Sequence, residues 1–216
     1  MNKDTSKKVA KILLDLKAVT FNPKVPYKYA SGIISPVYTD CRVIIGYPEK
    51  RREIRDLYIY AIEQSGVEFD VVAGTATAGI PHAAWIADKL NLPMVYVRGK
   101  AKDHGKGNTV EGIISPGQKA IIIEDLVSTG ESAINSFNAI KAFEGEATHV
   151  FSIMKYGLQK GEDNFKENGL TLISLTDFET ILKVAGENRD LNEEEIEMIK
   201  DWISDPEGWG KKHGYE

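Results

Sequence analysis

Cysteine is nearly absent from this sequence, since Cys41 is the only one among 216 residues. An internal disulfide framework is therefore excluded, and the composition fits a reducing compartment. A lone cysteine commonly packs as a small apolar side chain, so we expect Cys41 to lie half-buried in a strand. A chain of this length buries roughly 70% of its unfolded surface, which is sufficient for a full core without disulfide bonds.

Long apolar runs are also missing, and no stretch has the length needed to cross a bilayer. The N-terminus lacks the pattern of a signal peptide, because Val9, Ile12, Leu13 and Leu16 instead line one face of a helix. We therefore expect a cytoplasmic, soluble protein that has no membrane partner.

Basic residues are not in excess, because the formal net charge is −5. A dedicated nucleic-acid-binding protein usually presents a basic face, so a nucleic-acid partner is disfavoured. The 4 histidines and the single cysteine show no zinc-binding spacing. Repeats, low-complexity segments and clear linkers are absent as well, and the simplest organisation is a single domain of residues 1–216.

Short apolar segments that are typical of buried strands alternate with helical patterns between residues 46 and 187. Alternation of this kind indicates an α/β fold, in which helices cover both faces of a mainly parallel sheet. Residues 1–45 add a helix and an irregular or β-rich segment, and residues 188–216 form a helical tail. The expected strands comprise residues 69–74, 93–99, 119–125, 147–156 and 170–176. The expected helices after the N-terminal one comprise residues 47–66, 79–91, 130–145, 177–186 and 192–204.

An acidic pair, Glu124 and Asp125, stands at the end of an apolar run, where sheets of this class bind their ligands. These carboxylates need cations, N–H groups or a ligand as partners, because unpaired buried charge is very costly. The small-residue loop that follows leads into a helix, whose free N–H groups and dipole suit a phosphate. An ordinary capped turn explains the same pattern, and pattern alone favours it. The loop comprises Ser128, Thr129, Gly130, Glu131 and Ser132.

Two better-known motifs fail in this chain. A Walker A loop requires lysine and a hydroxyl residue after its second glycine, but Ile80 and Pro81 follow Gly79. A nucleophile elbow requires glycine two residues before the serine, but Leu126 precedes Ser128. The small residues 74–79 after a strand could still form a backbone nest for an anion, which alone is weak evidence.

Positive charge is concentrated in residues 98–107, between two apolar strands of an acidic protein. A glycine-rich basic loop of this kind can close over a polyanion and exclude water. The alternative, a solvated hairpin tip, does not explain the placement of the charge. Its basic side chains are Arg98, Lys100, Lys102, His104 and Lys106.

The three segments together require a ligand with two hydroxyls beside the acids, one phosphate at a helix N-terminus and a second polyanion below the basic loop. Phosphoribosyl pyrophosphate has these features. The segment 121–132, IIIEDLVSTGES, resembles the phosphoribosyl-pyrophosphate motif of the type I phosphoribosyltransferases. Residues 98–107, with the pattern R-x-K-x-K-D-H-G-x-G, are similar to the loop of the orotate branch, as are residues 31–42 and 73–87.

This resemblance extends from about Phe21 to Gly157 and implies the type I phosphoribosyltransferase fold, with a hood segment within residues 1–45. It implies transfer of the phosphoribosyl group from phosphoribosyl pyrophosphate to orotate, giving orotidine 5′-phosphate and pyrophosphate in de novo pyrimidine synthesis. The resemblance also implies Mg²⁺ carried by the substrate rather than bound in a protein site. In the family the basic loop reaches the neighbouring subunit's site, so a homodimer is implied.

Residue roles are likewise implied by the resemblance. Glu124 and Asp125 hold the ribose hydroxyls, and Asp125 also acts in catalysis. Arg98, Lys102 and His104 bind pyrophosphate, with Lys102 as the main catalytic charge and His104 as a second one. Ser128 also borders orotate. The residues that wrap the 5-phosphate are Leu126, Val127, Ser128, Thr129, Gly130, Glu131 and Ser132.

Several positions depart from the family pattern, chiefly on the base side. Some members have lysine at Ile34, Tyr-Lys at Thr77 and Ala78, or an orotate-binding arginine at Tyr156. Others have lysine directly after the loop arginine, where this chain has glycine. The weaker site candidates are therefore Lys100, Thr77, Ala78 and Tyr156.

Two other functions share many of these features. The first is a purine-type phosphoribosyltransferase, which the loop sequence KDHGKG disfavours. The second is a non-catalytic regulator that senses phosphoribosyl pyrophosphate. The acidic balance and the lack of a helix-turn-helix pattern before the sheet disfavour this regulator.

Overall fold

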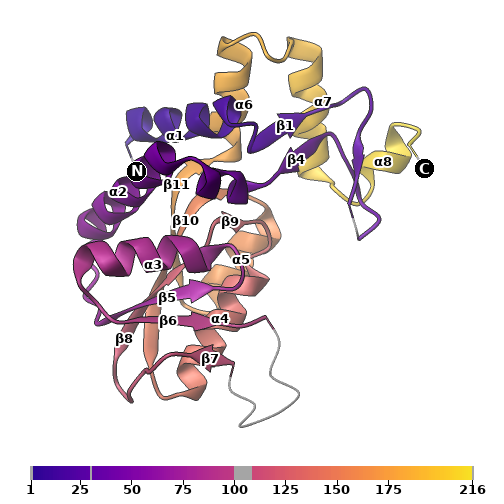
Figure 1. Cartoon of the computed structure of the whole chain (residues 1–216). Coiled ribbons are helices and arrows are strands. Elements are labelled where there is room, and N and C mark those ends of the chain that lie inside the picture. Colours follow the sequence, from indigo (N-terminus) through magenta and orange to yellow (C-terminus); the bar gives the residue numbers. More distant parts are fainter. Residues whose placement is uncertain (1, 30, 100–108, 216) are drawn as a thin grey trace.

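The computed structural model describes residues 2–29, 31–99 and 109–215. At its centre is a 7-stranded sheet with the order β11-β10-β8-β5-β6-β7, in which β9 also pairs with β10 (Figure 1). All strand pairs are parallel except β6 with β7, so the predicted mainly parallel sheet is confirmed. The strands are β5 (Val71–Thr75), β6 (Met94–Val97), β7 (Val110–Glu111), β8 (Lys119–Ile123), β9 (Leu126–Val127), β10 (Glu146–Lys155) and β11 (Thr171–Asp177).

Helices cover both faces of this sheet, as the sequence predicts. Along β8, Ile121 and Ile123 pack in the same core as α1, α2 and α3, whereas Ile122 packs in a second core with α4 and α5. This division follows from the strand geometry, because successive side chains point to opposite faces. The helices are α1 (Lys3–Asp15), α2 (Pro48–Ser65), α3 (Gly79–Leu90), α4 (Glu131–Ala142) and α5 (Gln159–Glu167).

Local signals set the ends of α2. Pro48 occupies the first turn, where its missing N–H is not needed, and Gly66 ends the helix with a φ of 66°. By contrast, the sequence does not reveal α5. Only Gly161 and Phe165 of that helix are buried, so its apolar periodicity is too weak to predict a helix.

The hood (residues 17–29 and 31–45) follows α1 and consists of two short antiparallel ladders and a 3₁₀ helix. Cys41 is buried in that 3₁₀ helix, so the expected half-buried strand position is wrong. The reason is Asp40, whose side chain accepts the backbone N–H of Arg42 and starts a helical turn. The hood elements are β1 (Val19–Phe21), β2 (Tyr27–Lys28), β3 (Ile34–Ser35), β4 (Val37–Thr39) and η1 (Cys41–Gly46).

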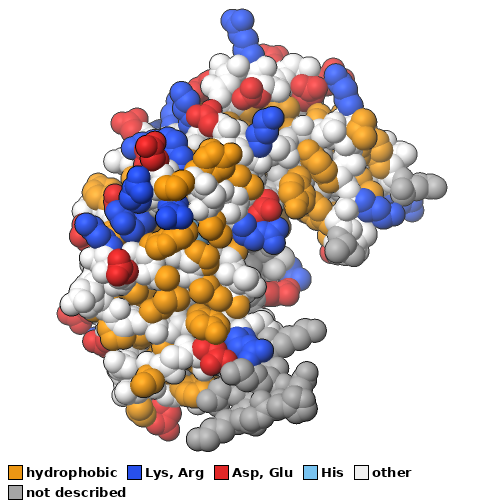
Figure 2. All heavy atoms as spheres, viewed as in Figure 1, with side chains coloured by type: hydrophobic (Ala, Val, Ile, Leu, Met, Phe, Trp, Pro, Cys, Tyr) orange, Lys and Arg blue, Asp and Glu red, His pale blue; other side chains and the backbone are white. Residues whose placement is uncertain are grey.

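The C-terminal segment returns to the hood through α6 (Phe178–Glu187), α7 (Glu193–Ser204) and α8 (Trp209–Lys212). We call residues 188–215 the tail. In Figure 1 the yellow α8 lies beside the hood, and α8 contacts β3. Figure 2 shows the surface hollowed between the lobe formed by hood and tail and the body that contains the sheet. Among the described residues, no helix combines the length and apolar character needed to span a membrane.

Candidate active site

The acidic pair follows β8 directly, because the strand ends at Ile123 and not at residue 125 as the sequence suggested. The backbone of Glu124 is fixed on both sides of the residue. Its N–H donates to the carbonyl of Phe151 at 2.9 Å, and its carbonyl accepts the Tyr58 hydroxyl at 2.6 Å. Tyr58 is completely buried, so the acids stand on a rigid support.

The Glu124 side chain is buried without sufficient partners, and Asp125 beside it is half-buried. Glu124 is 6% exposed, and no described residue donates a hydrogen bond to its Oε2. Burial, and then the charge of Asp125, raise the pKa of Glu124 well above its usual range. Burial also raises the pKa of Asp125, although backbone N–H groups and the charge of Arg42 oppose the shift. A ligand that supplies hydroxyl donors would relieve both carboxylates.

This burial predicts a pH-dependent effect of Glu124→Gln. A raised folded-state pKa means that Glu124 favours folding below its unfolded pKa, and that this contribution is lost as pH rises toward the folded pKa. The melting temperature of Glu124→Gln should therefore exceed that of the wild-type protein by a margin that grows from pH 5 to pH 8. Each kcal/mol corresponds to roughly 2–4 °C for a chain of this size.

Thermal unfolding of the free protein at the two pH values measures this effect. Glu197→Gln is the matched control, because the Glu197 side chain is 71% exposed on α7. An advantage of Glu124→Gln that stays constant or shrinks at higher pH would contradict the placement of a strained buried acid at residue 124.

The loop after the acids approaches the first turn of α4. Gly130 is the N-cap residue of this helix with a φ of 79°, and no side chain caps the helix. The first-turn N–H groups, which lack partners inside the helix, are therefore free of side-chain competition for an anion. The predicted phosphate cradle thus has the required backbone.

Helix α5 holds this loop in place, which the sequence did not suggest. Asn164 Nδ2 donates to the Thr129 carbonyl at 2.9 Å. A Cβ added at Gly130 would lie 2.5 Å from Phe165, and one added at Gly161 would lie 2.5 Å from the Ser128 carbonyl. Only the tertiary fold brings α5 to the loop, so no local sequence signal could have identified these contacts.

Gly130→Ala is therefore expected to destabilise the protein more than Gly157→Ala. Both positions have a positive φ, at 79° and 73°, but Gly157 has no neighbour within 4 Å of an added Cβ. Both variants incur backbone strain, whereas only Gly130→Ala also overpacks against buried Phe165, which costs roughly 1–3 kcal/mol.

Denaturant unfolding of both variants measures the difference in free energy. Equal losses would show that α5 does not constrain the loop.

The small residues after β5 lie close to the acids. An added Cβ at Gly79 would lie 2.3 Å from the Ile123 carbonyl, so this turn packs directly against the end of β8. The peptide bond between Ala76 and Thr77 is cis. Ala78 is the N-cap residue of α3 and provides no side-chain cap. Thr77 and Ala78 directly precede Gly79, whose added Cβ would also lie 3.4 Å from the Glu124 Cα.

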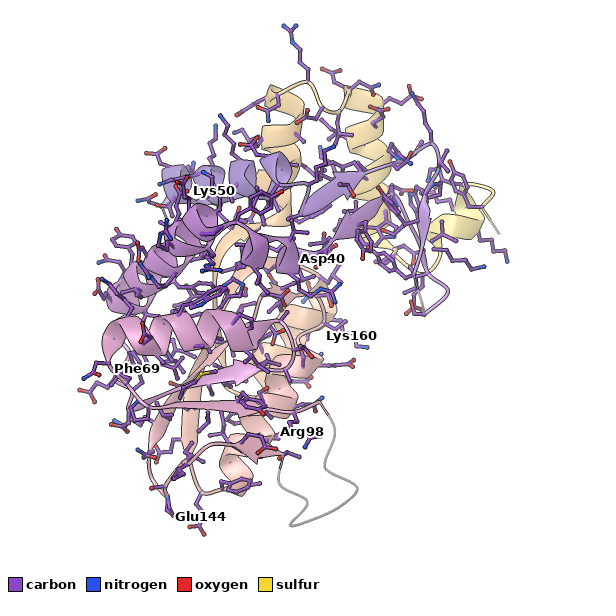
Figure 3. The ribbon with its side chains drawn as sticks, in the orientation of Figure 1. Asp40, Lys50, Phe69, Arg98, Glu144 and Lys160 are labelled. Carbon is purple, nitrogen blue, oxygen red and sulfur yellow. The ribbon has the colours of Figure 1, made fainter. Side chains whose placement is uncertain are left out.

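The basic loop is described only at its base. Arg98 follows β6, its N–H donates to the Thr109 carbonyl at 2.8 Å, and its Nη1 lies 3.4 Å from Glu111 Oε1. Figure 3 labels Arg98 where the described chain meets the loop. The predicted roles of Lys100, Lys102 and His104 concern positions outside the described residues.

On the hood side of the site, the candidate Tyr156 meets hood residues that the sequence did not single out. The hydroxyl of buried Tyr156 lies 2.8 Å from Thr39 Oγ1, which joins the end of β10 to the hood. Next along the hood, Asp40 forms a two-pronged ion pair with Arg42 at 2.7 and 2.9 Å. Thr39, Asp40 and Arg42 belong to segment 31–42, so the sequence resemblance indicated this segment but not the contacts of its side chains. Tyr156 therefore faces the hood as a hydroxyl and not as a cation.

Residues far apart in the sequence meet around the acids. Burial, and then the charges of Asp125 and Asp40, raise the pKa of the Cys41 thiol well above its usual range. Within the described ranges, no three His, Cys, Asp or Glu side chains form a group that could hold a metal ion.

Known proteins share this architecture and sequence. The family model described as phosphoribosyl transferase domain matches residues 48–186. The orotate phosphoribosyltransferase of Enterococcus faecalis strain ATCC 47077 / OG1RF is 48% identical over 206 residues, covering 95% of this chain and 98% of that protein. The orotate phosphoribosyltransferase of Coxiella burnetii is 47% identical over 209 residues, covering 97% and 99%.

A solved structure supports the same assignment. The crystal structure of orotate phosphoribosyltransferase from Aeropyrum pernix superposes with a TM-score of 0.74 at 28% identity, covering 83% of this chain and 98% of that chain. Besides this agreement in fold, the chain and the two relatives above share close to half of their residues over almost the full length. The chain therefore belongs to the type I phosphoribosyltransferase family and, within it, to the orotate phosphoribosyltransferases.

Proposed function

We propose that this protein transfers the 5-phosphoribosyl group of phosphoribosyl pyrophosphate to orotate, which gives orotidine 5′-phosphate and pyrophosphate. The observation that carries the proposal is the pairing of a buried, under-partnered acid at the end of β8 with the uncapped N-terminus of α4. One end of this short loop thus carries a carboxylate that can accept hydrogen bonds from hydroxyls, and the other end carries backbone N–H groups that can bind a phosphate. A ribose 5-phosphate is the group that both halves recognise.

The ribose lies over Glu124 and Asp125, with its hydroxyls donating to these carboxylates. Residues 126–132 surround the 5-phosphate, and the first-turn N–H groups of α4 donate to it. Ser128 also borders the acceptor base. During transfer the bond between the ribose C1 and the pyrophosphate oxygen breaks, a bond from an orotate ring nitrogen to C1 forms, and the proton of that nitrogen ends on the released pyrophosphate. Positive charge develops on the sugar, as in glycoside cleavage, and the buried negative charge of the acids stabilises it.

Negative charge grows on the departing pyrophosphate. Arg98, Lys102 and His104 stabilise that charge more in the transition state than in the ground state, with Lys102 contributing most. The turn at Thr77 and Ala78 borders the pyrophosphate. Since Ala78 stands where some relatives have lysine, a greater share of this stabilisation falls on the basic loop, including Lys100.

Mg²⁺ enters this scheme as part of the substrate. Mg²⁺ commonly keeps several of its waters and binds phosphate oxygens with few protein ligands. When bound, the ion supplies charge neutralisation at the pyrophosphate. The protein residues bind and orient the activated sugar, and they exclude water from it.

We further propose a homodimer in which the basic loop of one subunit completes the site of the other. In support of this, the described residues that flank the loop, Arg98 and Thr109, adjoin β6 and the edge strand β7, so the base of the loop lies at the edge of the sheet (Figures 1 and 3).

A competition between bases tests the proposed function. The protein is mixed with phosphoribosyl pyrophosphate, Mg²⁺ and equal amounts of orotate, uracil and a purine base, and each base is followed separately. Consumption of orotate alone is expected. Preferential consumption of the purine would identify a purine-type enzyme, and binding of phosphoribosyl pyrophosphate with no base consumed would identify a regulator.

A further inference from the structure

The position of Tyr156 depends on aromatic neighbours from the C-terminal part of the chain. Its ring centroid lies 5.1 Å from that of Phe178 and 5.9 Å from that of Trp202. On the side of α6 and α7, Tyr156 also borders a cleft of about 740 Å³. The two rings, together with the hydrogen bonds of its hydroxyl to Thr39 and to Tyr29 of the hood, therefore determine where that hydroxyl points.

Trp202 also binds the hood directly. Its indole Nε1–H donates to the backbone carbonyl of Ile34 at 3.1 Å. Ile34 lies in β3, and Ser35 beside it is buried and bonded to the Val37 backbone, so this hydrogen bond holds the middle of the hood. Trp202 thus contacts both the hood and Tyr156, which the hydrogen bond between Thr39 and Tyr156 also joins.

Other tail contacts support the same region. The Tyr215 hydroxyl donates to the Pro23 carbonyl at 3.0 Å. Gly210 lies so close to Ile34 that an added Cβ would approach the Ile34 Cβ to 2.9 Å. The tail therefore holds the hood at β3 and at Pro23, in the segment between β1 and β2. By contrast, the phosphate loop is held by α5, which does not belong to the tail.

We infer that Trp202 is a positioning residue for the acceptor base, and that the tail sets the affinity for orotate without setting the affinity for phosphoribosyl pyrophosphate. This inference rests on the proposed function, because it places the acceptor base on the side of the acids where the hood and Tyr156 meet. Trp202 acts through the Ile34 carbonyl and the Tyr156 ring. It does not contact the reacting atoms.

Trp202→Phe tests the inference, since it keeps an aromatic ring and removes the N–H donor. The KM for orotate should rise roughly three- to tenfold, because the Ile34 carbonyl loses its partner and the hood relaxes. The KM for phosphoribosyl pyrophosphate and kcat should change less than about twofold. Tyr215→Phe, which removes the second donor to the hood, should shift the KM for orotate in the same direction.

Trp209→Phe is the matched control, because the Trp209 indole donates at the same distance of 3.1 Å to the Met198 carbonyl, within the tail itself. It should lower the melting temperature and leave the KM for orotate unchanged. Equal changes in both KM values for Trp202→Phe, or an orotate effect as large in Trp209→Phe, would overturn the inference. A wild-type protein that consumes no orotate would instead contradict the proposed function.

Discussion

Replacing Asp125 with asparagine is expected to lower kcat about 100-fold while the protein remains folded. The asparagine keeps the size and the hydrogen-bonding reach of the side chain, but it removes the negative charge beside the ribose. Since burial raises the pKa of Asp125 in the free protein, loss of the charge should not reduce the melting temperature. Steady-state kinetics with both substrates and a thermal unfolding curve measure these two quantities.

Asp177→Asn is the control for this substitution. Asp177 caps α6 by accepting the Thr180 N–H at 2.8 Å, and asparagine caps helices equally well. Its kcat should therefore stay within about twofold of the wild-type value. Full activity in Asp125→Asn would show that the carboxylate has a structural role only.

Replacing Lys102 with alanine is expected to lower kcat about 100-fold or more, with a much smaller rise in the KM for phosphoribosyl pyrophosphate. The reason is that the charge on the departing pyrophosphate is larger in the transition state than in the bound substrate. Lys106→Ala in the same loop is the control and should retain nearly normal turnover. A Lys102→Ala variant with near-normal kcat would remove Lys102 from the mechanism.

The same two variants test the shared site. If the loop acts in the neighbouring subunit, mixing Lys102→Ala with Asp125→Asn subunits creates dimers in which one site has both wild-type residues. Random exchange should then restore about a quarter of the wild-type rate. If the loop acts within its own subunit, every site keeps one defect and mixing restores nothing.

Much of the fold could be predicted because it depends on local patterns. Strand β8 is an uninterrupted apolar run, and α2 has a proline at its start and a glycine at its end. Helix α5 could not be predicted in this way, because most of its residues are polar and exposed. Its contribution is visible only in three dimensions, where Phe165 closes against Gly130.

In the candidate site, too, the residues that are consecutive in the chain could be predicted and those that are distant in the chain could not. The acids and the predicted phosphate loop are consecutive in the chain, so residues 124–132 could be proposed as a site from the sequence alone. Their supports could not, because the Tyr58 hydroxyl reaches the Glu124 carbonyl from a residue 66 positions away. The contact between Trp202 and Ile34 spans 168 positions. No periodicity or motif encodes such pairs, which depend on how the helices and the hood pack.

The acceptor side is where sequence pattern and structure complement one another. The sequence indicated that Tyr156 replaces a cation found in some relatives, but it gave no substitute contact. The structure places the Tyr156 hydroxyl against Thr39 and places Trp202 behind it. The base is therefore expected to meet hydroxyl and backbone groups of the hood, with Arg42 as the nearby described cation that acts on Asp125.

The most direct test of the central claim is to measure orotate loss and pyrophosphate release in one reaction with phosphoribosyl pyrophosphate and Mg²⁺. A phosphoribosyl transfer at the end of β8 predicts equal amounts of the two, and neither change without Mg²⁺. Pyrophosphate released without loss of orotate, or no reaction while uracil or a purine is consumed instead, would contradict the account.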